Sequence, residues 1–508
     1  MATTKRKYPV GVQDFERIRR GGFVYVDKTP LIYKMVTDEA PTFLSRPRRF
    51  GKSLLVSTLA ALFEGRRDLF EAFTTEDGTE QPQLFIATTD WKWVQRPVLR
   101  FDFSKGKENT IEQLENKISN TLSLYEEQFG ITPVSKDASD RIESIILEAH
   151  RQSGHRVVVL CDEYDNAMLS AIGDDDLQKA VRQRFQNLFA PLKSLDGHLR
   201  FVFITGISKF SQMGIFSTLN NLENISMQQD YEAICGITEE ELVTQLHPDI
   251  EQLAGRRGES YDETLDALKK AYDGYHFGRS LVDVYNPFSL IKALKSGEIE
   301  NYWFESATMS SLITMLSKMP RLELTDLENV SCAASEFNKE FDSYAAPLPA
   351  LYQSGYLSIR SYNPARRRYT LGFPNEEVRT SFAECMYNYM SGSVEAGRRG
   401  SVFQDAYYDF CDSGDLAAFI EALQVFFAGV PYLLDNKNER HYHALLYTLL
   451  VSFGADVVAE EMTAKGRADI VLRIPTGIFI FELKYDGTVA EALTQIAKNG
   501  YARKYAMD

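Results

Sequence analysis

The stretch that decides the fold is APTFLSRPRRFGKS, residues 40–53. The apolar residues before the loop predict a short buried strand, and Leu55, Leu59 and Phe63 after it recur at the spacing of one helical face. A strand, a loop that ends in Gly-Lys-Ser and a helix form the context that a phosphate-binding loop requires. Backbone N–H groups at the start of such a helix point toward phosphate. The stretch therefore predicts an α/β domain with a nucleotide site.

The loop supplies the candidate ligands for ATP, which are Arg48, Arg49, Phe50, Gly51, Lys52 and Ser53. Lys52 would place a cation on the β- and γ-phosphate oxygens, and the Ser53 hydroxyl would bind Mg²⁺. Arg48 and Arg49 either neutralise phosphate charge or are simply solvated, and we rank these two interpretations equally. A third interpretation, action on the nucleotide of a neighbouring subunit, ranks below them. Arg46 stands where G-x-x-x-x-G-K-[ST] has its first glycine, which leaves open how fast ATP is hydrolysed.

A second motif, VVVLCDE at residues 157–163, predicts a buried strand that ends in two acids. This is the usual Walker B arrangement, in which Asp162 would hold Mg²⁺ through water and Glu163 would polarise the attacking water. The alternative is a buried strand that ends in a solvated acidic turn. The position of the motif about 110 residues after Lys52, with a further strand following it, favours the ATPase interpretation.

The strand that follows, RFVFI at residues 200–204, ends in polar residues. Thr205 or Ser208 is a candidate sensor of the γ-phosphate, and a simple strand-end cap is an equal alternative. With a further strand at 98–103, strands and helices alternate along the chain. This alternation predicts a parallel sheet that helices cover on both faces.

The C-terminal region predicts a second site. A helix, a strand with Asp469, a strand that leads into Glu482-Leu483-Lys484 and a final helix follow one another, which is the order of a PD-(D/E)XK nuclease core. Residues i and i+2 of a strand share a face, so Glu482 and Lys484 should project together. Asp469 and Glu482 can share a hard metal such as Mg²⁺, with Mn²⁺ as an alternative. Lys484 can orient a water molecule or offset transition-state charge.

Two more residues complete this candidate site. Glu439, on the first helix, is a candidate outer metal ligand, and Gln495, on the last, would orient the lysine or touch substrate. The alternative treats Asp469 as a turn cap and the Glu-x-Lys pair as a surface ion pair. The run IFIF at 478–481 predicts a fully buried strand, and two charges that emerge from such a strand favour a site.

Together these motifs resemble a bacterial family in which an AAA-ATPase-like domain is fused to a C-terminal domain of the PD-(D/E)XK nuclease superfamily. The matching segments run along nearly the whole chain: YPVG at 8–11, YVDKT at 25–29, RPRRFGKS at 46–53, DEYD at 162–165, TGIS at 205–208, YDGY at 272–275, YNPFS at 285–289, GRAD at 466–469 and ELK at 482–484. The resemblance implies a prokaryotic ATPase–nuclease tied to mobile elements or defence, with Arg46 as the family's own variant. Such nuclease cores usually add a strand after the last helix, so this core is either minimal or truncated at Asp508.

The 508 residues predict two to four domains. We expect an AAA-like P-loop ATPase domain at 1–237, a helical lid and winged-helix-like region at 238–375, a helical spacer at 376–435 and a small α/β nuclease-like domain at 436–508. The net charge of −15 excludes nucleic-acid binding through overall charge but allows a local basic groove. The turn at 366–368 carries three arginines, which either contact phosphate or are solvated.

The apolar stretches, the N-terminus and the cysteines indicate where in the cell the protein is expected. No apolar stretch approaches 18 residues and no secretory h-region follows the basic N-terminus, so we expect a cytoplasmic protein without a membrane span. Five dispersed cysteines without a CxxC pair predict reduced, mostly buried thiols.

The leading hypothesis is an ATP-binding, ATP-hydrolysing protein that regulates a metal-dependent nuclease acting on DNA or RNA. The alternatives are a nucleotide-dependent signalling switch or scaffold whose nuclease-like domain binds without cleaving, and a nucleic-acid translocase. A homo-oligomer is among the expected partners, because AAA-like ATPases often work as assemblies. The sequence leaves open the choice between DNA and RNA, the sequence specificity and the trigger.

Overall fold

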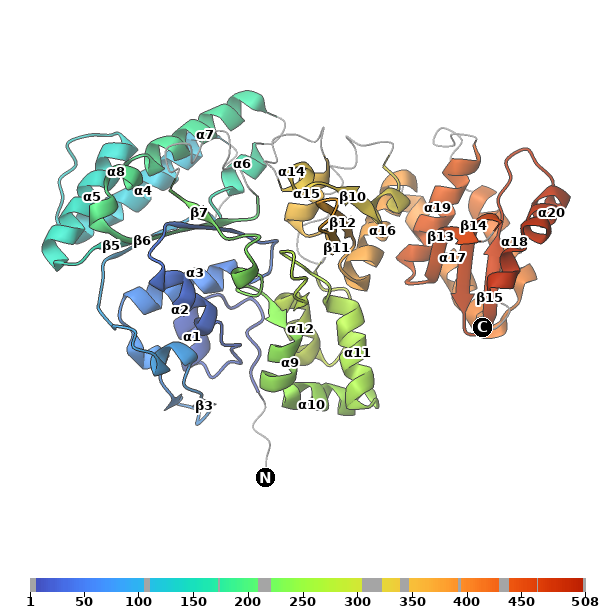
Figure 1. Ribbon diagram of the computed structural model, residues 1–508, viewed down its shortest axis with the longest axis horizontal. Helices are drawn as coiled ribbons and strands as arrows, with labels where there is room; N and C mark the ends of the chain where they lie inside the picture. Colours follow the sequence, from blue (N-terminus) through green and yellow to red (C-terminus); the bar gives the residue numbers. More distant parts are fainter. Residues whose placement is uncertain are drawn as a thin grey trace. The chain divides into compact units, whose positions relative to one another are not determined.

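The computed structural model describes residues 6–104, 110–171, 174–208, 221–303, 322–338, 347–391, 394–428, 438–463 and 465–505 (Figure 1). The chain divides into two compact units, of which the first holds residues 1–302 and 331–374 and the second holds 303–330 and 375–508. Among the described residues, no helix combines the length and apolar character needed to cross a bilayer.

The first unit is built on a five-stranded parallel sheet. Its strand order is β4 (Val98–Asp102), β5 (Val157–Asp162), β6 (Leu199–Gly206), β1 (Thr42–Ser45) and β7 (Glu223–Asn224). Successive side chains of β5 alternate between faces, so Val157, Val159 and Cys161 join one core cluster. All six residues of β5 are buried, which is what a parallel sheet covered on both faces requires. The predicted α/β P-loop fold is confirmed.

Helices cover both faces of this sheet (Figure 1). One face packs against α4 (Ile111–Phe129), α5 (Ala138–Ser153), α7 (Asp175–Phe189) and α8 (Pro191–Ser194), whose apolar residues fill the core. The other face packs against α3 (Lys52–Phe63), where the Phe63 and Phe201 rings lie 5.5 Å apart. The remaining elements here are α1 (Phe15–Arg20), α2 (Thr29–Thr37), the hairpin β2 (Phe73–Thr74) with β3 (Glu80–Gln81), and α6 (Asn166–Ser170).

A helical subregion follows the sheet within the first unit. It contains β8 (Ile237–Thr238), α9 (Glu239–Gln245), α10 (His247–Arg257), α11 (Tyr261–Tyr272), β9 (Val284–Tyr285) and α12 (Pro287–Ser296). Thr238 caps α9, because its hydroxyl accepts from the backbone N–H of Glu241 while the Glu241 carboxylate accepts from the Thr238 backbone N–H. The apolar faces of these helices form a separate core cluster.

The last part of the first unit is a small helix-and-hairpin module. It contains β10 (Val330–Cys332), α14 (Ala334–Phe337), α15 (Pro347–Ser354), β11 (Ser358–Asn363) and β12 (Arg368–Gly372). The strands form a sheet in the order β10-β12-β11, in which β11 and β12 are antiparallel. Strands β11 and β12 are joined as a hairpin by the turn that carries the arginine cluster. Arg366 and Arg367 lie exposed at its turn, whereas Arg368 donates to the Ser331 hydroxyl at 3.1 Å.

The second unit combines helices with a three-stranded antiparallel sheet. Its elements are α16 (Glu376–Ser391), α17 (Val394–Ser413), α18 (Leu416–Ala428), α19 (Glu439–Ser452), β13 (Asp456–Thr463), β14 (Gly466–Ile474), β15 (Gly477–Phe481) and α20 (Val489–Asn499). The sheet order is β13-β14-β15. One prediction is wrong here: β15 is half-buried along its whole length, not fully buried. Within the described part of the sheet it is an edge strand, so one side lacks the cover that a central strand receives.

Candidate nucleotide and metal sites

The predicted phosphate loop connects the end of β1 to the start of α3. Gly51 caps α3 with φ 90°, and a Cβ atom at this position would meet nothing within 4 Å. The left-handed backbone, not a lack of space, therefore calls for glycine. Arg49 also has a positive φ of 68°. The loop reaches the helix through two left-handed residues, and the first backbone N–H groups of α3 remain available for phosphate.

Lys52 is held inside this loop. Its ammonium donates to the carbonyl oxygens of Arg46 and Pro47, both at 2.9 Å, and the side chain is buried. Burial lowers the pKa of Lys52, and the negative charges of Glu163 and Asp162 oppose that shift. The predicted ATP-binding lysine therefore lies within electrostatic reach of both acids at the end of β5.

Ser53 and Asp162 come together as the sequence predicts for a magnesium site. The Ser53 hydroxyl hydrogen-bonds to the Asp162 carboxylate, which is 6% exposed. Burial raises the pKa of Asp162, and the Ser53 hydrogen bond opposes that rise. Asp162 Oδ1 is buried without a hydrogen-bond partner among the described residues. A buried carboxylate oxygen with an open coordination position, next to a hydroxyl, fits Mg²⁺.

Glu163 is placed by an unusual backbone. Its φ is 49°, a left-handed value that is uncommon for residues other than glycine. Burial raises the pKa of Glu163, while the charges of Lys52 and Arg48 oppose the rise. Arg48 is half-buried on the loop and acts electrostatically on Glu163, whereas Arg49 is exposed, with its guanidinium 4.6 Å from the Phe288 ring centroid.

The two candidate sensors are engaged in contacts inside the fold. The Thr205 hydroxyl donates to the Leu44 carbonyl oxygen of β1 at 2.7 Å, and the Ser208 hydroxyl donates to Asp165 at 2.6 Å. Both side chains are buried. This geometry is that of the strand-end cap, the alternative weighed above, and a sensor role for either residue stays a prediction.

Asp165 is a member of the site that the sequence reasoning did not assign. Its Oδ2 also accepts from the backbone N–H groups of Ile207 and Ser208, at 2.9 and 2.6 Å, so one fully buried carboxylate joins the ends of β5 and β6. A Cβ atom at Gly206 would collide with this carboxylate, which explains the glycine. The DEYD and TGIS segments carried the signal, since the two motifs bond to each other.

Phe50 and Arg46 fasten the loop to the rest of the unit. Phe50 is buried and its ring lies 4.7 Å from that of Tyr275 and 5.4 Å from that of Phe277. Arg46 is 1% exposed, and its guanidinium donates to the carbonyl oxygens of Ser45, Ser226, Tyr231 and Glu232. The side chain of Phe50 therefore packs in the core, so a contribution of this residue to ATP binding would come from its backbone.

An apolar pocket of about 170 Å³ opens beside the phosphate loop. Its lining comes from segments far apart in the sequence, namely 9–13, 24–32, 49–58, 234–237 and 287–291. Apolar walls next to a phosphate-binding loop suit the flat base of a nucleotide. Composition and spacing did not reveal this pocket, although the YPVG, YVDKT and YNPFS segments of the resemblance all contribute to it.

The second predicted site is assembled in the second unit. Asp469, on β14, accepts from the backbone N–H of Leu483 at 2.8 Å, which brings the two predicted acids to adjacent strands. The Lys484 ammonium lies 2.8 Å from Glu482 Oε1 and 3.7 Å from Glu439 Oε1. Residues 482–484 lie just past the end of β15, and the contact between Glu482 and Lys484 places their side chains on one side, as predicted.

Gln495 and Glu439 approach this cluster from the flanking helices. The Gln495 side-chain amide donates to Glu482 Oε1, the oxygen that also accepts from Lys484, and its role in orienting the lysine or touching substrate stays a prediction. Glu439, the first residue of α19, accepts from the backbone N–H of Tyr485 at 3.4 Å. All five predicted residues therefore gather at the carboxyl end of β15.

The charges of this cluster are compatible with a divalent metal. Burial raises the pKa of Glu482, whose side chain is 1% exposed, and the nearby Asp469 and Glu439 carboxylates add to the rise. Burial lowers the pKa of Lys484, but the Glu482 hydrogen bond and the surrounding carboxylates outweigh it and the net shift is upward. Glu482 Oε2 is buried and accepts no hydrogen bond from any described residue. Three carboxylates with one orphaned oxygen suit an oxygen-loving cation.

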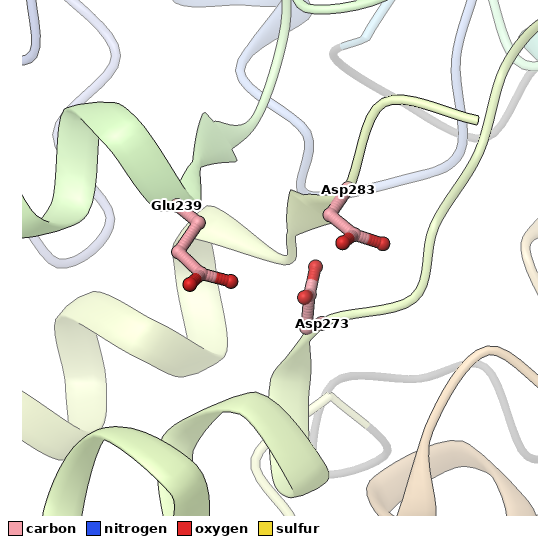
Figure 2. A group of neighbouring side chains, drawn as sticks. All are labelled: Glu239, Asp273 and Asp283. Atoms are coloured by element: carbon pink, nitrogen blue, oxygen red, sulfur yellow. The ribbon is translucent and has the colours of Figure 1, made fainter. Parts of the chain in front are cut away.

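A third group of acids lies between α9, α11 and β9. Figure 2 shows the carboxylates of Glu239, Asp273 and Asp283 turned toward one another. The Lys269 ammonium pairs with Glu239 and lies 4.0 Å from Asp283, which also contacts the His276 ring at 2.8 Å. Because Lys269 already supplies a cation at this place, the group is an internal charge network and not a metal centre comparable to the other two.

Comparisons with known proteins identify a family for each of the two regions that hold the predicted sites. A family model described as predicted AAA-ATPase matches residues 9–216, and a model described as PD-(D/E)XK nuclease superfamily matches residues 437–508. The chain is 33% identical over 515 residues to a protein of Azotobacter chroococcum mcd 1 called "Uncharacterized protein in vnfD 5'region". That alignment covers 99% of this chain and 94% of the relative.

Proposed function

Because the chain belongs to a family of predicted AAA-ATPases that carry a C-terminal domain of the PD-(D/E)XK nuclease superfamily, we propose that it is an ATP-regulated, metal-dependent nuclease that acts on DNA or RNA. The observation that carries the proposal is the gathering of Asp469, Glu482 and Lys484 around one buried, unpartnered carboxylate oxygen in the described part of the second unit.

The roles in cleavage follow from the chemistry of these side chains. Asp469 and Glu482 would hold a divalent metal, which when bound stabilises negative charge on the scissile phosphate and makes a bound water more acidic. Lys484 would donate to the attacking water or to the phosphate oxygen that gains charge. Gln495 keeps Glu482 oriented through its amide. Glu439 keeps negative charge near the Lys484 ammonium, which favours the charged form of the lysine.

ATP binding is assigned to the first unit. Lys52 would neutralise the terminal phosphates, Ser53 and Asp162 would hold Mg²⁺, and Glu163 would accept a proton from the attacking water. The raised pKa of Glu163 suits a general base, since burial makes its carboxylate a stronger proton acceptor than an exposed glutamate. The apolar pocket beside Gly51 would take the base and sugar. In this proposal the state of the nucleotide controls whether the C-terminal domain cuts.

The decisive experiment uses the purified full chain on a panel of single-stranded and duplex DNA and RNA. Cleavage would be followed with Mg²⁺ or Mn²⁺, in the presence of ATP, a non-hydrolysable analogue or no nucleotide. Asp469→Asn should abolish cleavage. Lys52→Ala should leave cleavage in place but remove the dependence of cleavage on ATP. Asp456→Asn, an exposed acid at the start of β13, is the matched control. If Asp469→Asn cuts as fast as the native chain, the proposed active site is wrong.

A further inference from the structure

Next to the proposed active site, Tyr485 presents an exposed aromatic ring. It follows Lys484 directly in the chain and is 39% exposed. Its ring stacks on that of Tyr442, with the centroids 6.0 Å apart and the planes inclined by only 16°. A large ring left partly in water keeps unburied apolar surface, which favours a further stacking partner.

This ring pair is held in place by the same elements that hold the carboxylates. Tyr442 lies three residues after Glu439 on α19, so both side chains leave the same face of that helix. The Phe427 ring of α18 braces Tyr442 edge-on at 5.3 Å and 77°. The backbone N–H of Tyr485 donates to Glu439, and the next residue, Asp486, turns the chain with φ 57°. The platform, defined as Tyr485 backed by Tyr442, is therefore tied to the active-site residues.

We propose that this platform binds an unpaired nucleobase beside the scissile phosphate, so that the substrate of this site is single-stranded nucleic acid. The inference deepens the proposed nuclease function and rests on it for the position of the phosphate. Every base has an aromatic face, and base stacking on an exposed aromatic ring is tolerant of sequence. Bases inside a duplex already stack on their neighbours, so a paired base cannot use this platform without being extruded. Lys484, adjacent in the chain, would sit close to the backbone phosphate of the stacked nucleotide.

Binding, measured without cleavage, tests the platform. The full chain carrying Asp469→Asn would be titrated with short DNA and RNA single strands that contain 2-aminopurine, whose fluorescence falls when it stacks. Tyr485→Phe should keep the quenching, whereas Tyr485→Leu should lose it and bind about tenfold more weakly. The same probe paired in a duplex should show no dependence on Tyr485. Tyr408→Leu, which removes a 49% exposed tyrosine from α17, is the matched control, and thermal unfolding checks that each variant is folded.

Each outcome decides one of the two proposals. Equal quenching and affinity in Tyr485→Leu, no quenching with the native tyrosine, or the same effect on duplex would overturn the platform. If the native chain never cuts but quenching depends on Tyr485, the nuclease proposal fails and the platform stands as a nucleic-acid site. If cutting depends on Asp469 while Tyr485→Leu keeps both quenching and the kcat/KM for single strands, the platform fails and the nuclease stands. The DNA and RNA arms identify which single strand is bound more tightly.

Discussion

The Arg46 guanidinium lies over the Phe277 ring, with its central carbon 4.1 Å from the ring centroid. Phe277 follows α11 in the chain, whereas Arg46 is the first residue of the phosphate loop. A cation over a buried ring is worth more than the same contact in water. The residue that replaces the usual glycine therefore joins the loop to the helical subregion of the same unit.

Replacing Arg46 by the glycine that the motif usually has at this position should destabilise the protein. Arg46→Gly leaves the buried Ser226 carbonyl oxygen without its side-chain donor and removes one of the two donors to the Tyr231 carbonyl oxygen. We expect a loss of about 3–5 kcal/mol in the free energy of unfolding, and no gain in ATP affinity. Arg49→Gly is the matched control, since Arg49 is exposed with φ 68° and glycine relieves that backbone. Urea unfolding and ATP titration measure both effects, and a native-like Arg46→Gly protein would contradict the structural role.

Asp165 should contribute more to the stability of the fold than an exposed aspartate does. Asp165→Ala would strand the Ile207 and Ser208 N–H groups and the Ser208 hydroxyl, all of which donate to this buried carboxylate. We expect a loss of about 3 kcal/mol or more in unfolding free energy, and a smaller loss for Asp165→Asn, whose amide oxygen can still accept. Asp176→Ala, an exposed acid in the first turn of α7, should change little. Equal midpoints of urea unfolding for the two alanine variants would contradict this account.

The parts that could be predicted from the sequence depend on local geometry. The buried run at 157–161 predicts a strand of a covered sheet, and the spacing of Glu482 and Lys484 predicts that their side chains lie on one side, where they meet. The sequence shows that Arg46 replaces the first glycine of the motif. It does not predict what Arg46 contacts, because its partner Ser226 lies 180 residues further along the chain. The sequence predicts too much burial for β15 because an apolar strand has the same sequence pattern at the centre and at the edge of a sheet.

The same reasoning explains the missed members of the sites. Asp165 sits in a visible acidic motif, yet its role depends on the meeting of two strand ends, which only the sheet order brings about. The apolar pocket is built from five separated segments, and it exists only where the fold brings all of them together. Contacts between distant segments can be predicted only when the topology of the fold is known, whereas contacts between residues two or four apart follow from the local strand or helix geometry.

Gln495 offers a sharp test of the proposed active site. Gln495→Glu replaces the amide that donates to Glu482 by a carboxylate facing it, so we expect cleavage to fall about 10- to 100-fold, as is typical when a residue that orients a metal ligand is changed. Thr494→Glu adds the same charge at the neighbouring exposed position of α20 and should have a much smaller effect. Cleavage rates over a Mg²⁺ titration measure the difference. Equal losses in both variants would mean that overall charge on α20, not the orientation of Glu482, controls activity.

Asp273 should make the stability of the first unit depend on pH. Burial raises the pKa of Asp273 to about 6, from about 3.8 when the chain is unfolded. Between these values the folded chain keeps a proton that the unfolded chain has lost, so stability falls as pH rises through this window. Two pKa units correspond to about 3 kcal/mol, and this cost is fully present above pH 6 and absent below pH 4. The Asp273 carboxylate, one of the three acids in Figure 2, is therefore a source of instability at neutral pH.

Asp273→Asn removes the charge and should raise the unfolding free energy at pH 8 by about 1.4 kcal/mol more than at pH 5. Asp266→Asn, an exposed acid in the middle of α11, should show the same small change at both pH values. Urea unfolding of the native chain and the two variants at pH 5 and pH 8 measures this double difference. A gain for Asp273→Asn that is equal at both pH values would mean that the mutation acts through packing. A larger gain at pH 5 would reverse the sign and exclude a buried, proton-binding Asp273.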